Sequence, residues 1–180
     1  PVRPIVASKR DLLRIIAEFH GFRRSMRAAE AMYGSNFPDL GNIEQLHVLS
    51  NLGDADAEGQ PVVQAVWYLL NYAFENRVSD IHIEPKRDES WVRMRIDGVL
   101  HRVHRMPKVV HPAVVSRLKT LARLDIAERR RPQDGRFKTR YLQSEVEIRI
   151  STAPTAFGEK VVARVFDPGV LIQDIDSIGF

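Results

Sequence analysis

A strand, turn and strand pattern over residues 81–106 constrains the fold of this chain more than any other feature of its sequence. Apolar and polar residues alternate over 81–84 and again over 91–96, which is the period of strands that have one buried face. Asp97-Gly98 follows directly, and this dipeptide favours the positive backbone dihedrals of a tight hairpin turn into a strand over 99–106. The pattern therefore predicts an antiparallel sheet.

Helices and further strands are predicted around this hairpin. Helical spacing of apolar residues predicts one helix from Pro61, where proline suits the first turn, and another from His111. On the second helix we expect apolar residues such as Leu118 to face the core and Lys119 to lie outside. Alternation predicts three later strands, at 137–141, 146–151 and 160–166. This order indicates an α+β domain in which helices pack on an antiparallel sheet.

Residues 1–60 are predicted to form a region separate from residues 61–180. Apolar spacing over residues 8–34 predicts a helical segment interrupted at Gly21, with a second short helix from about Ser25 to Met32. Residues 35–60 have little periodicity and end in an acidic, glycine-containing stretch that is typical of a flexible connection. We expect a domain boundary after residue 60.

Composition and charge restrict the classes of function. Hydrophobic residues make up 44% and charged residues 28% of the 180 residues, and the apolar runs are far shorter than the ~20 residues of a membrane helix. The absence of cysteine excludes disulfides, thiol catalysis and thiolate metal sites. Residues 101–140 carry twelve Lys/Arg and three Asp/Glu, so an anionic partner is expected if this segment binds anything. The start of the chain, without an initiator Met, indicates a piece of a longer protein.

Metal and acid/base chemistry find little support in the sequence. His82 and Glu84 share a strand face, but no spacing matches a zinc framework, and we expect no metal site. Asp125, Glu128 and Asp134 lie close together along the chain, yet each is flanked by arginine, which favours plain ion pairs. No phosphate-binding loop and no nucleophile motif is present, so the chain on its own has no recognisable catalytic site.

Two arginines are stronger candidates. Alternation places Arg149 on the strand over 146–151 and Arg164 on the strand over 160–166. If these strands pair, both guanidiniums can project towards one anion, and planar, permanently charged groups suit phosphate oxygens. The alternative is that each arginine pairs with a cross-strand glutamate, and spacing alone favours that alternative.

Several motifs in order resemble one family, the secretion ATPases of type II secretion and type IV pilus assembly. The resemblance covers about residues 61–180 and corresponds to the family's second N-terminal domain, a PAS-like fold that precedes a RecA-like ATPase domain. Residues 2–8 and the following helix resemble the end of the first N-terminal domain. The matching motifs lie at 79–85, 93–100, 124–130, 132–136, 149–152 and 158–162.

This resemblance implies a role for the arginines. In the family, six subunits form a ring and nucleotide binds between the second N-terminal domain and the ATPase domain. Two arginines from the matched strands reach the phosphates, and Arg149 and Arg164 occupy those positions, as arginine-finger-like groups. Arg136 is expected either to line the same cleft or to be a solvated turn arginine. ATP and Mg²⁺ are then expected in the full-length parent, with nothing tightly bound to this part alone.

The resemblance also implies partners and a location. The family assembles as a homo-hexamer in the cytoplasm and acts on an inner-membrane platform protein and docking proteins. The chain ends at residue 180, about where the ATPase domain would begin, so we expect no ATPase activity from residues 1–180 alone. Two alternatives remain open: a docking or ligand-sensing module, for example for a cyclic dinucleotide, and a basic nucleic-acid-binding domain, which no recognition motif supports.

Overall fold

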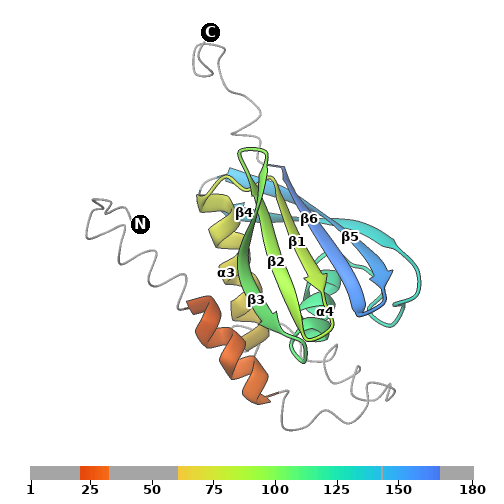
Figure 1. The fold of residues 1–180 in the computed structure, drawn as a ribbon. Helices are drawn as coiled ribbons and strands as arrows, with labels where there is room; N and C mark the ends of the chain where they lie inside the picture. The colour runs from red at the N-terminus through yellow and green to blue at the C-terminus, as the bar shows by residue number, and fades with distance from the viewer. Residues whose placement is uncertain (1–20, 33–60, 143, 167–180) are drawn as a thin grey trace.

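The computed structural model describes residues 21–32, 61–142 and 144–166. In these ranges the chain forms a six-stranded antiparallel sheet with strand order β3-β2-β1-β6-β5-β4, and helices cover one of its faces (Figure 1). The predicted α+β architecture is thereby confirmed. The elements are α3 Pro61–Glu75, β1 Asp80–Pro85, β2 Glu89–Ile96, β3 Val99–Pro107, α4 His111–Leu121, β4 Gln133–Tyr141, β5 Ser144–Thr155 and β6 Gly158–Phe166.

The predicted hairpin forms between β2 and β3. Ile96 pairs with Val99, and the two turn residues between them, Asp97 and Gly98, have φ values of 48° and 79°. Positive φ at both central positions is the geometry that a two-residue hairpin requires. The two halves of the sheet meet where β1 pairs with β6, which lies far from it in sequence.

The hydrophobic core lies between the helices and one face of the sheet. Alternate residues of each strand point into it, and this period-two pattern is the one predicted from the sequence. Helix α3 contributes one apolar stripe, and α4 contributes another. The fully buried side chains include Ile83, Val92, Met94, Ile148 and Val161.

Residues 21–32 form a helix that packs on the same core. The prediction that this helix begins at Ser25 is wrong, because Gly21 is already helical. A Cβ atom at Gly21 would lie 2.5 Å from Cζ of Tyr68, so this glycine permits a close approach to α3. Phe22 and Met26 are buried in the core. The other expectations for residues 1–60, including the boundary after residue 60, concern residues outside the described ranges.

The predicted exposure of Lys119 is also wrong. This side chain is 1% exposed, and its ammonium group forms an ion pair with the buried carboxylate of Glu159 at 2.5 Å. It also donates a hydrogen bond of 2.7 Å to the backbone carbonyl of Glu128. The segment between α4 and β4 therefore covers a side of the helix that the apolar pattern assigned to solvent. Among the residues described, no helix is long and apolar enough to cross a membrane.

Candidate functional site

Charged side chains gather on the sheet face opposite the helices. The strand register places five residues directly across from one another on β2, β1, β6, β5 and β4. We call this set the arginine row; in spatial order it consists of Arg95, Asp80, Arg164, Arg149 and Arg136.

All three arginines predicted as site residues belong to this row. Strands β5 and β6 pair as expected, and Arg149 lies directly opposite Arg164. Arg136 lies opposite Arg149 on the other side. Adjacent strands are roughly 4.8 Å apart, and like charges placed directly opposite destabilise a sheet. Three consecutive arginines in register therefore form a site at which a bound anion would relieve repulsion.

Carboxylates only partly neutralise the row. Arg164 Nε lies 2.9 Å from Asp80 Oδ1, and Arg95 Nε lies 3.3 Å from the other oxygen of the same carboxylate. Glu147 contacts both remaining arginines, at 3.3 Å from Arg149 and 3.7 Å from Arg136. The alternative expectation, in which Arg149 and Arg164 each pair with a cross-strand glutamate, is not met: the cross-strand partner of Arg164 is an aspartate, and Glu147 lies on the same strand as Arg149. Four guanidiniums share two carboxylates, which leaves an excess of two positive charges.

The central guanidiniums present their ends to solvent. Arg164 and Arg149 each hydrogen-bond to their carboxylate through Nε, and their side chains are 63% and 59% exposed. The ring of Phe166 lies 4.6 Å beneath the guanidinium of Arg149 and orients it by a cation–π contact. Within the described residues the Nη nitrogens of both arginines make no hydrogen bond, so they remain available for phosphate oxygens.

The carboxylate of Asp80 contacts two arginines of the row, Arg164 and Arg95. Its burial alone would raise the pKa of the carboxyl group, but hydrogen bonds from Arg164 and Ser79 and the charge of Arg95 hold that pKa below its usual value. The carboxylate therefore stays ionised and fixes the guanidinium of Arg164. Asp80 and Arg95 are members of the site that the sequence patterns do not single out. Alternation indicates their positions on the outward-facing side of β1 and β2, but it carries no information about the register between β1 and β6.

The predicted lack of a metal framework concerns His82 and Glu84, which lie two positions apart on β1. His82 lies on the open face, and the carboxylate of its neighbour Glu84 is occupied by Arg93 at 2.5 Å. Burial lowers the pKa of His82, and the charge of nearby Lys160 lowers it further. No group of three potential metal ligands comes together in the part of the chain that the structure describes.

The three clustered carboxylates bind neighbouring polar groups. An oxygen of Asp125 accepts hydrogen bonds from the backbone N–H groups of Ala127 and Glu128. Glu128 accepts from the backbone of Arg130, and Asp134 accepts from the hydroxyl of Ser151. Among the described residues none of these carboxylates forms the predicted arginine ion pair: Asp125 and Glu128 bind backbone N–H groups of their own loop, and Asp134 binds its cross-strand neighbour on β5. The arrangement provides no carboxylate pair for acid/base chemistry.

Comparison with known proteins identifies the family. The sequence profile of the family described as "Type II/IV secretion system protein" matches residues 55–180. The chain belongs to this family. It is similar to the type IV pilus assembly ATPase TfpB of Acinetobacter baylyi, with 42% identity over 177 residues, which cover 98% of this chain and 30% of that protein.

Relatives from both kinds of machinery match. Type IV pilus assembly ATPase PilB of Myxococcus xanthus is 47% identical over 125 residues, covering 69% of this chain and 22% of that protein. Type II secretion system protein E of Xanthomonas campestris pv. campestris is 42% identical over 142 residues, covering 79% of this chain and 24% of that protein. The chain thus spans less than a third of the length of these relatives. The predicted resemblance to secretion and pilus-assembly ATPases is confirmed.

Proposed function

We propose that this chain is the non-catalytic N-terminal part of a motor ATPase for type IV pilus assembly or type II secretion, and that its arginine row contacts the phosphates of ATP. The observation that carries the proposal is the excess positive charge of the row together with the exposed Nη nitrogens of Arg149 and Arg164. Family membership supports the proposal. The relative from Acinetobacter baylyi is named a type IV pilus assembly ATPase, and the relative from Xanthomonas campestris is named as a protein of the type II secretion system.

In this proposal ATP and Mg²⁺ are held by a RecA-like ATPase domain beyond residue 180. Arg149 and Arg164 approach the phosphates from a separate rigid sheet and stabilise the charge that develops during phosphoryl transfer. Asp80 and the Phe166 ring hold the guanidiniums in position, while Arg136 extends the positive surface. Loss of the γ-phosphate would weaken the contact, so hydrolysis would let the two domains move apart.

The same proposal assigns partners and a location. Six copies of the full-length protein would form a ring in the cytoplasm, next to the inner membrane. The domain motion would act on a membrane-embedded platform protein, and docking proteins would hold the ring in place. Residues 1–180 alone would hydrolyse no ATP, and any nucleotide affinity of this part would be weak because exposed arginines alone recover little binding energy.

The test uses the full-length parent protein. Arg149→Ala and Arg164→Ala are compared with Arg140→Ala, an exposed arginine on β4 outside the row. We expect kcat for ATP hydrolysis to fall by about 10²-fold or more in each row variant, since arginine fingers contribute roughly 10³–10⁵. The control variant should keep its rate, and all three proteins should keep their oligomeric state in size-exclusion chromatography. Unchanged rates in the row variants would show that these arginines only form surface ion pairs and do not act on the phosphates.

A further inference from the structure

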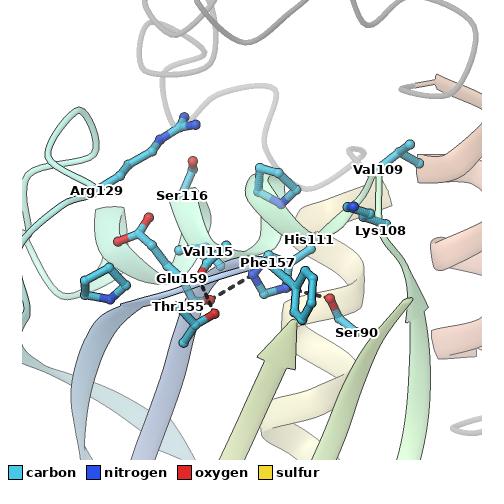
Figure 2. A pocket seen from close by; sticks show the side chains of 13 residues that line it. Ser90, Lys108, Val109, His111, Val115, Ser116, Arg129, Thr155, Phe157 and Glu159 are labelled. Atoms are coloured by element: carbon cyan, nitrogen blue, oxygen red, sulfur yellow. Dashed lines mark hydrogen bonds between the residues drawn. The ribbon is translucent and has the colours of Figure 1, made fainter. Parts of the chain in front are cut away.

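A second candidate site lies far from the arginine row, at the end of the sheet where β5 turns into β6. The pocket there has a volume of about 470 Å³, which is within the range of ligand-binding pockets. Thr155 lies six residues beyond Arg149 along β5, roughly 20 Å at 3.3 Å per residue. We call this site the hairpin pocket. Its walls are largely apolar and include Val109, Pro112, Val115, Pro154 and Phe157 (Figure 2).

The floor of the hairpin pocket is rigid. His111 Nε2 donates a hydrogen bond of 2.8 Å to the backbone carbonyl of Glu159, so Nδ1 of the neutral ring accepts one from the hydroxyl of Ser90 at 3.0 Å (Figure 2). Burial lowers the pKa of His111 and keeps the ring neutral. The side chain of Glu159 is paired with buried Lys119 directly behind this floor. These contacts link β2, α4 and β6, and the pocket is therefore preformed.

The mouth of the pocket is flanked by exposed apolar side chains. Phe157 at the hairpin tip is 48% exposed, and Val109 before α4 is 37% exposed. Both belong to the small set of large hydrophobic residues that the described part of the chain leaves in solvent. A small molecule confined to the cavity would leave these rims uncovered. A peptide segment that inserts one side chain and lies across the mouth would cover them.

The rim of the pocket carries two cationic side chains. Figure 2 shows Arg129 on one side of the pocket and Lys108 on the other. No carboxylate of the described residues lies within ion-pair distance of either group, and Lys108 Nζ contacts only the backbone carbonyl of Arg87, at 2.9 Å. The acidic residue that lines the pocket, Glu159, is already neutralised by Lys119. The rim therefore favours a negatively charged ligand.

We propose that the hairpin pocket binds a peptide segment of a partner protein in which one large apolar side chain is flanked by carboxylates. The apolar side chain fills the cavity between Val115 and Phe157, and the carboxylates meet Lys108 and Arg129. This site does not depend on the arginine row. It also gives part of the basic segment over 101–140 a role that the proposed nucleotide contact leaves unexplained.

The test starts from a displayed library of random dodecapeptides selected on the full-length protein. We expect enriched sequences to share a Trp, Phe or Leu next to Asp or Glu. One enriched peptide is then labelled with a fluorophore, and its binding is measured by anisotropy. Ser116→Trp, which places an indole in the pocket from α4, should weaken binding at least tenfold. Arg129→Glu should weaken it at least fivefold, and the adjacent control Arg130→Glu, which does not line the pocket, should change it less than twofold.

Clear outcomes would overturn this proposal. Enriched peptides that are basic or lack an apolar anchor would contradict the assigned chemistry. Peptides that bind Ser116→Trp as tightly as the parent, or a selection that enriches no sequence, would show that the pocket is not a peptide site. Retained ATP hydrolysis in Ser116→Trp would show that the variant is folded, and it would separate failure here from failure of the arginine proposal.

Discussion

The buried ion pair between Lys119 and Glu159 offers the sharpest test of how this domain is held together. The ammonium is 1% exposed and the carboxylate 9%, and the two groups lie 2.5 Å apart between α4 and β6. Lys138 and Glu145 form a chemically identical pair at 2.6 Å on the surface, with side chains 60% and 66% exposed. The two pairs differ mainly in burial, so the second is a matched control for the first.

Removing one partner should be far more damaging than removing both. Glu159→Gln leaves a buried ammonium group without a counter-charge, with only neutral oxygens such as the carbonyl of Glu128 as acceptors, and breaking a buried pair in this way costs about 3–5 kcal/mol. Lys119→Met together with Glu159→Leu removes both charges. Gln133 still donates to the Glu128 carbonyl, at 2.9 Å, so no acceptor is orphaned. We expect the double variant to recover most of the stability lost in Glu159→Gln.

Urea unfolding of residues 1–180, followed by tryptophan fluorescence and circular dichroism, measures these differences. With m values of about 1–3 kcal/mol/M, a loss of 3 kcal/mol lowers the midpoint by about 1–3 M urea. The corresponding changes at Lys138 and Glu145 should shift the midpoint far less, because solvent screens exposed pairs. Equal shifts for the buried and the exposed pair, or a double variant as unstable as Glu159→Gln, would refute this account of the core.

Three further predictions concern other contacts. Burial, reinforced by the charge of Arg23, lowers the pKa of His104 from 6.5 to about 4. The free energy of unfolding should therefore have its full value above pH 6.5 and fall by up to about 3 kcal/mol as the pH drops towards 4. His104→Gln should flatten this pH dependence in urea titrations. Gly135→Ala should destabilise by about 1–3 kcal/mol in the same assay, because a Cβ there would lie 2.7 Å from a backbone carbonyl that follows α4. Asp80→Asn in the full-length protein should lower kcat less than Arg164→Ala does, since the guanidinium loses its anchor but keeps its charge.

Periodicity predicts the elements of this fold because each strand has one buried face. The alternation around Ile83 and Val92 fixes which side chains enter the core, and Asp97-Gly98 fixes where the chain reverses. The same alternation is sufficient to assign Arg149 and Arg164 to the outward face. Their alignment in one row could not be predicted in this way, because it depends on the register between strands.

Lys119 and Gly21 show where sequence patterns stop being sufficient. A lysine on the polar side of an amphipathic helix is normally solvated, and its burial here depends on a loop that folds over α4 and on a carboxylate forty residues away. A glycine within a helical pattern weakens the helix relative to alanine and is expected to interrupt it, whereas Gly21 is helical and permits contact with Tyr68 on another helix. Both cases need a partner that is distant in sequence. Local periodicity carries no information about such partners.

The two faces of the sheet have different roles, and this difference explains why the like charges of the arginine row can lie side by side. On the core face, apolar side chains specify the register of the strands, and the Lys119–Glu159 pair joins α4 to β6. That register forces Arg136, Arg149 and Arg164 into adjacency whatever their mutual repulsion. Two carboxylates neutralise only half of the positive charge of the row. The packing energy of the core offsets the repulsion between the remaining charges. A phosphate group bound at the row would then both satisfy the guanidiniums and stabilise the sheet.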